Sequence, residues 1–237
     1  MTPLQQPAHA PVAFSPRWDA TFPGGHVGLL LLGPVDNSAA APALDGYKQA
    51  LVAEVRQEYG NLSRTELQAA PILGAYRDYY RGFKKTYHVQ LQLESVAHKG
   101  KGLPDVNPLV DACFAAELET HLLTASHDAD LLVDPVTVTA STGAEILPLM
   151  TGGEKQIKAG DMLMRDGRGP ICTIIYGQDR RTAVTPRTRR VLYVTYAPAP
   201  ITAGDVARHQ RTLLANVRRF APEAIVELDR IVTAAKP

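Results

Sequence analysis

Two short stretches of the sequence carry side chains that could perform chemistry: GLPDVNPLVDA at 102–112 and SHDAD at 126–130. In the first, Asn107 precedes a proline, which is typical of a helix N-terminus. The free N–H groups and the positive dipole end of such a helix suit a carboxylate, a phosphate or a polarised carbonyl. In the second, His127 could orient a ligand by hydrogen bonding or, as the less favoured role, act as a general base.

Both features also have an ordinary structural interpretation. Asn107 can cap a helix whether or not anything binds there. His127 stands among polar residues where a chain usually turns, which would leave its ring partly exposed. The two residues mark a pocket only if the helix start and the histidine turn face each other.

Common catalytic signatures are missing from the sequence. It contains no phosphate-binding loop and no GxGxxG, GxSxG or HExxH motif. His127-Asp128 is similar to the HD signature of metal-dependent phosphohydrolases, whose chemistry needs several further His and Asp ligands on helices. The other histidines are scattered along the chain, so we expect no metal and no cofactor.

The composition is that of a globular protein, with 45% of the 237 residues hydrophobic and 21% charged. The 25 basic and 24 acidic residues leave a net charge of +1, whereas reliance on bulk phosphate attraction usually brings a larger basic excess. Contact with a nucleic acid would therefore need a local basic patch. Cys113 and Cys172 lie in apolar surroundings and predict buried free thiols, not a disulfide framework or a zinc site.

Nothing in the sequence indicates a membrane or secreted protein. No apolar run approaches the length of a membrane span, and the first residues lack the features of a secretory signal. We therefore expect a cytoplasmic protein with no membrane contact. The Pro, Ala and Gln content of residues 1–16 predicts a flexible N-terminal tail.

Two basic stretches could contact RNA phosphates. One interleaves Arg77, Lys84 and Lys85 with tyrosines, and the other places five arginines within eleven residues, beginning with Arg180 and Arg181. Solvated surface and tyrosine packing are the commoner interpretations of such stretches. The residues that we expect to bind RNA are Arg77, Lys84, Lys85, Arg180 and Arg181.

The elements that must position these residues are mainly helical in the first half of the chain. HVGLLLLG at 26–33 predicts a buried strand, and apolar residues at helical spacing then predict a helix from Asp45 to Tyr59. Ser63-Arg-Thr-Glu66 is a capping-box pattern that opens another helix, with a break at Pro71. Segment 88–97 fits a strand or a helix, and a further helix begins at Pro108.

After residue 130 the chain consists of short segments rich in Val, Ile, Thr and Tyr, which predict strands, with a hairpin at Asp166-Gly167. Two apolar stripes then predict helices over 203–220 and 223–235. Helices, then strands, then helices favour an α+β fold. We expect a single domain over 17–237, with its C-terminal helices within 203–235.

Several stretches together resemble one family. GLPDVNPLVDA resembles the LP-x-x-N-x-x-VD segment of the B3/B4 domain, the editing module of the bacterial phenylalanyl-tRNA synthetase beta subunit. SHDADLL is similar to that domain's P-x-H-x-x-D-L turn, with His127 and Asp130 on the matching positions. TGAEILPL and the stretch from 159 to 188 resemble its following strands. The likeness covers about 76–196, without the catalytic core of a synthetase, as in a free-standing B3/B4 protein.

The resemblance implies a three-layer fold with a central β-sandwich of unusual topology and flanking helices, and it implies that 88–97 is helical. It also implies a pocket that receives the aminoacylated end of a tRNA. In the synthetase, that pocket hydrolyses the ester of a wrongly attached amino acid, tyrosine instead of phenylalanine. The partner implied here is therefore tRNA or aminoacyl-tRNA.

Residue by residue, the resemblance implies a substrate-binding set. Asn107 matches a pocket asparagine, and His127 matches a histidine that helps recognise the misattached side chain. Ile175 and Gly177 fall on a strand of small residues that lines the pocket, and Asp179 falls near a pocket glutamate. Asp130 completes the substrate-binding set, which consists of Asn107, His127, Asp130, Ile175, Gly177 and Asp179. The chain departs from the family at Phe114, Ile174 and Ile175, whose bulk would change the amino acid accepted or close the pocket.

Three functions follow from this. The leading hypothesis is a deacylase that hydrolyses mischarged aminoacyl-tRNA in trans, with His127 as the candidate catalytic or orienting residue. The alternative is a non-catalytic module that binds tRNA or a small ligand, which the near-neutral charge and bulky Ile174-Ile175 favour. The third is an interaction protein that pairs through its C-terminal helices. The sequence leaves the oligomeric state open.

Overall fold

The computed structural model describes residues 12–235. In chain order the elements are β1 (Ala13–Phe14), α1 (Pro16–Thr21), β2 (His26–Gly33), α2 (Pro42–Tyr59), α3 (Arg64–Leu67), α4 (Pro71–Gly82), α5 (His88–Lys99), α6 (Pro108–Thr120), β3 (Thr124–Asp128), the short 3₁₀ turn η1 (Ala129–Leu131), β4 (Thr137–Ala140), β5 (Ile146–Pro148), β6 (Glu154–Gln156), β7 (Met162–Asp166), β8 (Gly169–Thr173), β9 (Gly177–Gln178), β10 (Val191–Ala197), α7 (Ala203–Arg218) and β11 (Ile225–Thr233). The fold is α+β, as the sequence predicts.

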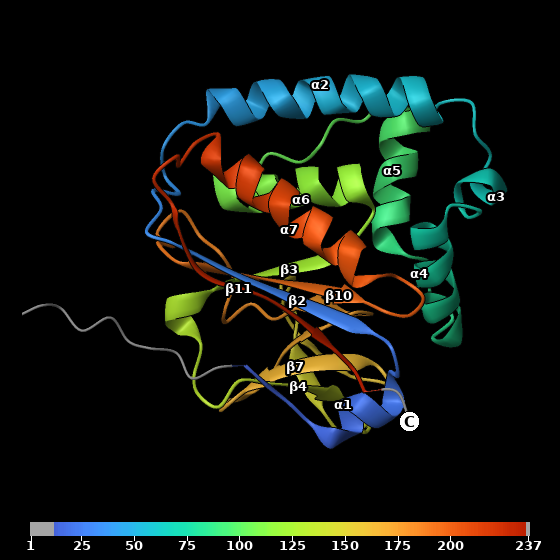
Figure 1. Cartoon of the computed structure of the whole chain (residues 1–237), viewed down its shortest axis with the longest axis vertical. Coiled ribbons are helices and arrows are strands. Elements are labelled where there is room, and N and C mark those ends of the chain that lie inside the picture. The colour runs from blue at the N-terminus through green and yellow to red at the C-terminus, as the bar shows by residue number, and fades with distance from the viewer. Residues whose placement is uncertain (1–11, 236–237) are drawn as a thin grey trace, which may run out of the picture.

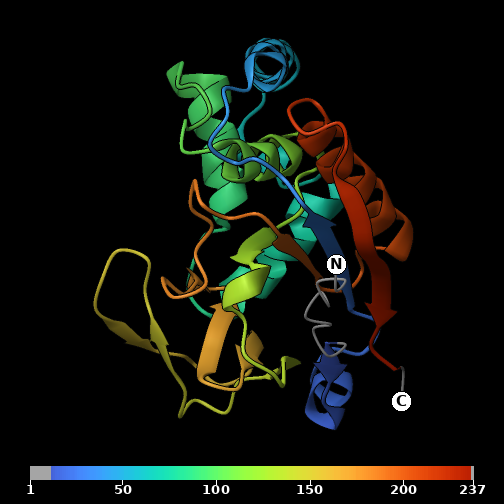
Figure 2. The ribbon, with the colours of Figure 1, turned by 90° about the vertical axis from the view of Figure 1, so that its left-hand side faces the viewer.

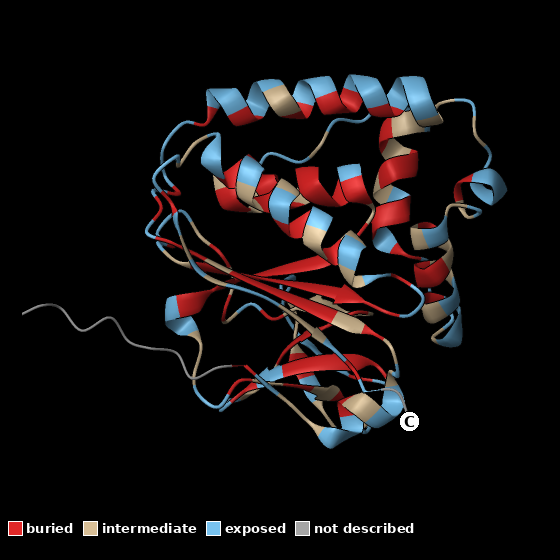
Figure 3. Ribbon diagram, in the orientation of Figure 1, coloured by how far each residue is buried: buried red, intermediate tan, exposed pale blue. Residues whose placement is uncertain are grey.

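These elements form three layers (Figure 1). Helices α2, α5, α6 and α7 lie over a middle sheet with the strand order β11-β2-β10-β3, and a second sheet with the order β1-β4-β7-β8-β9 lies beneath it. Buried residues concentrate in the middle sheet and on the inner faces of the helices (Figure 3). No helix within 12–235 is long and apolar enough to cross a membrane.

Local signals in the sequence explain most helix boundaries. Asn107 accepts a hydrogen bond from the Val110 N–H at 3.2 Å and so caps α6, as predicted. Ser63 and Glu66 form the predicted capping box of α3. α4 begins at Pro71 itself, because proline fits the first turn of a helix. Segment 88–97, ambiguous by pattern, is helical, as the family resemblance implies.

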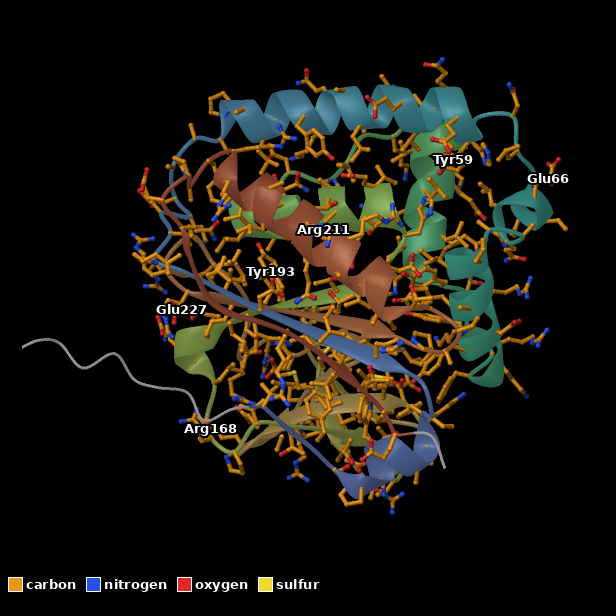
Figure 4. The ribbon with its side chains drawn as sticks, viewed as in Figure 1. Tyr59, Glu66, Arg168, Tyr193, Arg211 and Glu227 are labelled. Carbon is orange, nitrogen blue, oxygen red and sulfur yellow. The ribbon has the colours of Figure 1, made fainter. Side chains whose placement is uncertain are left out.

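The middle sheet is organised around β10, which is buried along its whole length and pairs antiparallel with both β2 and β3. Val191 and Tyr193 pack with α6 and α7, and the Tyr193 hydroxyl donates to the Leu109 carbonyl at 2.7 Å. Tyr193 is labelled in Figure 4, between the sheet and the helices. Val194 and Tyr196, on the other face, belong to the core that also contains residues of the lower sheet.

The lower sheet is antiparallel from β4 to β9, and only β1 pairs parallel, with β4. β7 and β8 form the hairpin predicted at Asp166-Gly167. A separate hairpin, β5 with β6, projects from the body of the protein (Figure 2).

Three sequence predictions are wrong in part. The segment predicted as a helix over 223–235 contains strand β11, because its β-branched residues pair with β2 along the edge of the middle sheet. SHDAD at 126–130 is no turn: Ser126, His127 and Asp128 end strand β3, and η1 follows. Within the predicted tail, 1–11 lie outside the described residues, whereas 12–16 are ordered through β1 and the start of α1.

The main hydrophobic core draws residues from both extremes of the described chain, from Val12 to Ala234. It includes residues of the helix layer, the middle sheet and the lower sheet. That 17–237 form a single domain stays a prediction.

We predict that Gly28→Ala destabilises the protein. A Cβ at Gly28 of β2 would lie 2.6 Å from a methyl group of the buried Val206 of α7, so this side chain or the helix would have to shift. We expect a loss of about 1–3 kcal/mol in the free energy of unfolding, measured by urea denaturation. Gly46→Ala is the matched control, because no atom lies within 4 Å of a Cβ there. It should stabilise the exposed helix by about 0.5–1 kcal/mol. Equal effects at the two positions would contradict this account of the packing.

Candidate binding cavity

A cavity of about 570 Å³ lies between the helix layer and the ends of the two sheets. Its size is in the range of small-molecule sites. The lining comes from α5, α6, β3, β8, β9, β10 and the connecting loops, and it is mostly apolar. The lining residues are His88, Gln92, Pro104, Val106, Val110, Cys113, Phe114, Glu117, Leu123, Thr124, Ala125, Ser126, Met150, Cys172, Thr173, Gly177, Gln178, Val184 and Tyr196.

One wall of the cavity is a single face of α6. Val110, Cys113, Phe114 and Glu117 are spaced by three or four residues, so their side chains point to the same side of the helix. Three of them are apolar, and Glu117 is the one carboxyl among the lining residues. α6 is capped through Asn107, which holds this face at a defined angle.

The opposite wall is the outer edge of β3, which forms a bridge with Ala183 at its far end. β3 is the last strand of the middle sheet, so only one of its edges is paired within that sheet. Residues 123–126 line the cavity along this segment, and the Ser126 N–H donates to the Gln178 side chain at 3.2 Å. That contact joins β3 to β9 of the lower sheet and closes one end of the cavity. Exposed Val106 and Met150 stand among the lining residues at its mouth.

Glu117 is the most unusual group in the wall, because it is a buried carboxyl with no cation beside it. Its Oε1 accepts a hydrogen bond from the Thr124 N–H at 2.8 Å. Burial raises the pKa of Glu117 to about 8, against the lowering effect of that N–H. At neutral pH the carboxyl is therefore mostly protonated while the cavity is empty.

His88 is the histidine of the lining, at the start of α5. The Tyr80 hydroxyl donates to the Ile174 carbonyl at 2.6 Å, so the Tyr80 oxygen accepts from His88 Nδ1 at 2.9 Å. That arrangement assigns the ring proton to Nδ1 and leaves Nε2 able to accept one. Loss of hydration at the ring lowers the pKa of His88, although the residue as a whole is exposed.

A buried hydrogen-bond network on α7 supports the cavity wall from behind. Thr120 donates to the Ala116 carbonyl, so its oxygen accepts from His209 Nδ1 at 2.6 Å. His209 Nε2 in turn accepts from the hydroxyl of Thr124, whose N–H is bound to Glu117. Burial lowers the pKa of His209 to about 3, so this histidine is neutral and serves to hold Thr124 in position.

Asn107 does not line the cavity. Its side chain is buried, caps α6 and accepts a hydrogen bond from Asn37 Nδ2 at 2.9 Å. Asn37 Oδ1 accepts from the Leu109 N–H, so both asparagines are engaged in fixing the start of the helix. The structural interpretation of Asn107 therefore accounts for its contacts in full.

His127 is fully buried and lies outside the cavity lining, in contrast to the exposed turn histidine that the local sequence indicates. Thr182 donates to Asp179, so its hydroxyl oxygen accepts from His127 Nδ1 at 2.7 Å. Asp179 lies 3.5 Å from Arg181, which forms two hydrogen bonds with Asp166. The structure thus joins His127, Asp179 and Arg181 in one network, but the network is internal.

Of the remaining predicted substrate-binding residues, one lines the cavity and others lie outside it. Gly177 lines the cavity, as the resemblance implies. Ile175 is half-buried against the main core and does not line it, and neither does Ile174, which is fully buried in that core. Asp130 forms a salt bridge with Arg190 at 2.9 Å. The predicted bulky wall is therefore made by Phe114 alone.

The five predicted RNA-binding residues differ in their ion pairs and in their exposure. Arg181 is held by Asp166 and Asp179, and Arg77 pairs with the neighbouring Asp78 at 3.0 Å. Lys84, Lys85 and Arg180 are exposed. Lys84 and Lys85 precede the lining residue His88, and Arg180 follows the lining residue Gln178, so these three stand near the cavity in sequence.

One cluster of carboxylates in the described chain could in principle hold a metal ion, formed by Asp45, Asp105 and Asp111. The Lys48 ammonium already lies within 3.9 Å of all three, and 2.6 Å from Asp111. Lys48 thus supplies the positive charge that a metal would bring. Both cysteines are free and buried, as predicted, and both line the cavity.

We predict that His127 makes stability depend on pH. Burial lowers its pKa to about 4, from 6.5 in an unfolded chain. Below pH 6.5 the unfolded state binds a proton that the folded state does not, so the stabilisation is complete above pH 6.5 and is lost as the pH falls towards 4. His127→Gln should flatten the pH dependence by up to about 1.4 kcal/mol per pH unit over this interval. Urea unfolding at pH 7.5, 6 and 5 measures it, and an unchanged slope would refute the assignment.

Comparison with known proteins identifies the family. The sequence model of the B3/4 domain matches residues 74–221, more than half of the chain and all of the cavity lining. Among solved structures, an N-terminal fragment of the phenylalanyl-tRNA synthetase beta subunit from Pyrococcus horikoshii is similar at 11% identity, over 89% of this chain and 49% of that one, with a TM-score of 0.45. The chain thus spans about half the length of that fragment. No curated protein matches the sequence. The chain belongs to the B3/4 domain family.

Proposed function

We propose that the protein hydrolyses the ester bond of a mischarged aminoacyl-tRNA in trans and holds the aminoacyl group in the cavity of about 570 Å³. The cavity carries this proposal, because it is concave and mostly apolar and lies within the part of the chain that matches the B3/4 domain. The family resemblance supplies the choice of substrate. An apolar cavity of this size accommodates the side chain of an amino acid.

The reaction requires little from the protein. Water attacks the ester carbonyl carbon, the bond to the ribose oxygen breaks, and the proton from the water ends on that oxygen. A neighbouring ribose hydroxyl can assist, and the protein contributes by positioning the ester and the water. In this proposal His88 Nε2 accepts the proton from the water, because Nδ1 is bonded to Tyr80.

Polar groups for orienting the ester are present in the same wall. Ser126 and Gln178 line the cavity from β3 and β9 and bring a hydroxyl and an amide group to it, whereas the hydroxyl of the lining residue Thr173 is already bonded to Asp161. Such donors can stabilise the negative charge that develops on the carbonyl oxygen. His127 has no direct part in this proposal, in contrast to the role that the resemblance implies.

The tRNA itself would bind outside the cavity. No Lys or Arg occurs among its described lining residues, so the phosphates need cations at the rim. Exposed Lys84, Lys85 and Arg180 are the candidates, being close in sequence to lining residues.

The second candidate function is binding of a small ligand without turnover. One observation favours it: His127 and Asn107, the residues that the resemblance assigns to the site, are sealed behind the wall. Saturable binding without release of amino acid would distinguish such a module from a deacylase.

The first experiment is a deacylation assay on a panel of mischarged tRNAs. We expect the wild type to release the amino acid from at least one of them. Val110→Trp should abolish the release, because the half-buried Val110 lines the cavity and the larger ring would fill it. Gln49→Trp places the same ring on the exposed face of α2 and should leave the rate unchanged. A folded wild type that releases nothing would overturn the proposal, as would an active Val110→Trp.

We further predict that Phe114→Ala changes the amino acid preference. Phe114 is the bulky, half-buried part of the α6 wall, so its removal enlarges the cavity. Larger aminoacyl groups should gain on smaller ones by roughly tenfold in kcat/KM, the scale of a few methylene groups in an apolar pocket. The control is Leu91→Ala, which removes a 40% exposed apolar residue that does not line the cavity. An identical preference in both variants would exclude Phe114 from the specificity wall.

A further inference from the structure

The further inference concerns Glu117 and the kind of ligand that the cavity takes. Its side chain belongs to a residue only 3% exposed, on the α6 face that lines the cavity. Oε1 is engaged by the Thr124 N–H, and no described residue donates a hydrogen bond to Oε2. Oε2 is not sealed off by protein atoms. Since Glu117 lines the cavity, Oε2 opens onto it.

The carboxyl has no cation of its own. The described lining includes no Lys or Arg, and Glu117 is in no salt bridge among residues 12–235. Some buried carboxylates of the chain have a cation, as Asp111 has Lys48 and Asp166 has Arg181. Buried Asp161 has none, but both of its oxygens accept hydrogen bonds, from the Tyr79 hydroxyl and the Ile175 N–H. A carboxylate buried without a counter-ion costs several kcal/mol, which the empty protein avoids by keeping Glu117 protonated. A cationic ligand beside Oε2 would supply the missing counter-ion and favour the carboxylate.

We propose that Glu117 recognises the protonated amine of the ligand, and that the cavity therefore takes small amines that carry an apolar group. The apolar lining holds the body of such a ligand, while the ammonium donates to Oε2. Binding converts the carboxyl to a carboxylate, whose proton leaves to solvent, and forms an N–H···O ion pair. The α-ammonium of an aminoacyl ester is one such group; that identification rests on the proposed function, whereas amine recognition does not.

The proposal differs from a purely structural role for Glu117. Fixing the Thr124 N–H requires only an acceptor oxygen, which an amide supplies equally well. Glu117→Gln therefore preserves the shape and the bond to Thr124 and removes only the ability to carry charge. A neutral carboxyl that merely hydrogen-bonds a ligand carbonyl would also be replaced by the amide with little loss.

The test uses two probes of nearly equal size, phenethylamine and 2-phenylethanol, with binding followed by amide chemical shifts of the labelled protein. We expect the wild type to prefer the amine, and Glu117→Gln to reduce its affinity for the amine by roughly tenfold or more with little change for the alcohol. Equal affinity for the two probes in the wild type, or an unchanged preference in a folded Glu117→Gln, would overturn the proposal.

A measurement on the wild type alone covers the case in which the variant does not fold. Burial raises the pKa of Glu117 to about 8, so amine binding should release a proton and strengthen from pH 6 to pH 8. Alkyl amines stay protonated over this interval. The other titratable groups around Glu117 are His88, Cys113, Cys172, Tyr76, Tyr80, Tyr87 and Tyr196; the pKa values of the thiols and tyrosines are raised, and that of His88 is lowered. His209, which reaches Glu117 through Thr124, also has a lowered pKa. Glu117 is the group of this set whose pKa is placed within the interval, so amine affinity that does not vary with pH would refute the proposal.

The outcomes separate this proposal from the deacylase function. Glu117-dependent amine binding without release of amino acid from any tRNA would support amine recognition and remove the enzyme. The opposite outcome is deacylation that is equally fast in wild type and Glu117→Gln, both for an aminoacyl ester and for its analogue without the amino group. It would support the deacylase function and remove amine recognition by Glu117.

Discussion

The structure depends on the burial of both faces of β10. This strand is covered on one side by α6 and α7 and on the other by the lower sheet, so every residue from Val191 to Ala197 is buried. A strand in that situation is mainly apolar, and the hydrogen bonds of its backbone must be satisfied by its neighbours. β2 and β3 provide them on either side. The position of the helix layer relative to the lower sheet is thereby fixed by β10. The cavity lies beside β3, the strand next to β10 at which the middle sheet ends.

The distribution of charge follows from this arrangement. The lower sheet contributes Asp166 and Asp179, and their buried carboxyl groups are compensated internally by Arg181. Buried His127 and His209 have lowered pKa values and stay neutral, with threonine hydroxyls as partners. The cavity is therefore almost free of charge, and the one carboxyl in its wall is held mainly in its acid form. A ligand entering this space meets hydrocarbon, hydroxyl and amide groups, and a single acid.

Much of the fold could be predicted from short sequence patterns, but less of the site. The Asn107-Pro108 cap, the Ser63–Glu66 capping box and the hairpin at Asp166-Gly167 are decided by neighbouring residues, and the structure has all three. β11 resembles a helix in its spacing of Ile and Leu, and only its partner β2, distant in sequence, makes it a strand. The position of His127 likewise depends on β10, which no local pattern around SHDAD can show. The sequence pattern does not mark Glu117 as a cavity residue, because it continues a helical stripe whose other members are apolar. Its signal was a single acid at a position where the spacing predicts a buried face.

The pairing of β2 with β11 has a consequence for biosynthesis. β2 ends at Gly33, whereas the strand that covers its edge begins at Ile225. During translation the N–H and C=O groups on this edge of β2 therefore stay unpaired until β11, about 190 residues further along the chain, has emerged from the ribosome. Such long-range pairing slows folding and leaves a strand edge exposed to other chains. We expect the nascent protein to be a client for chaperones that shield open strand edges.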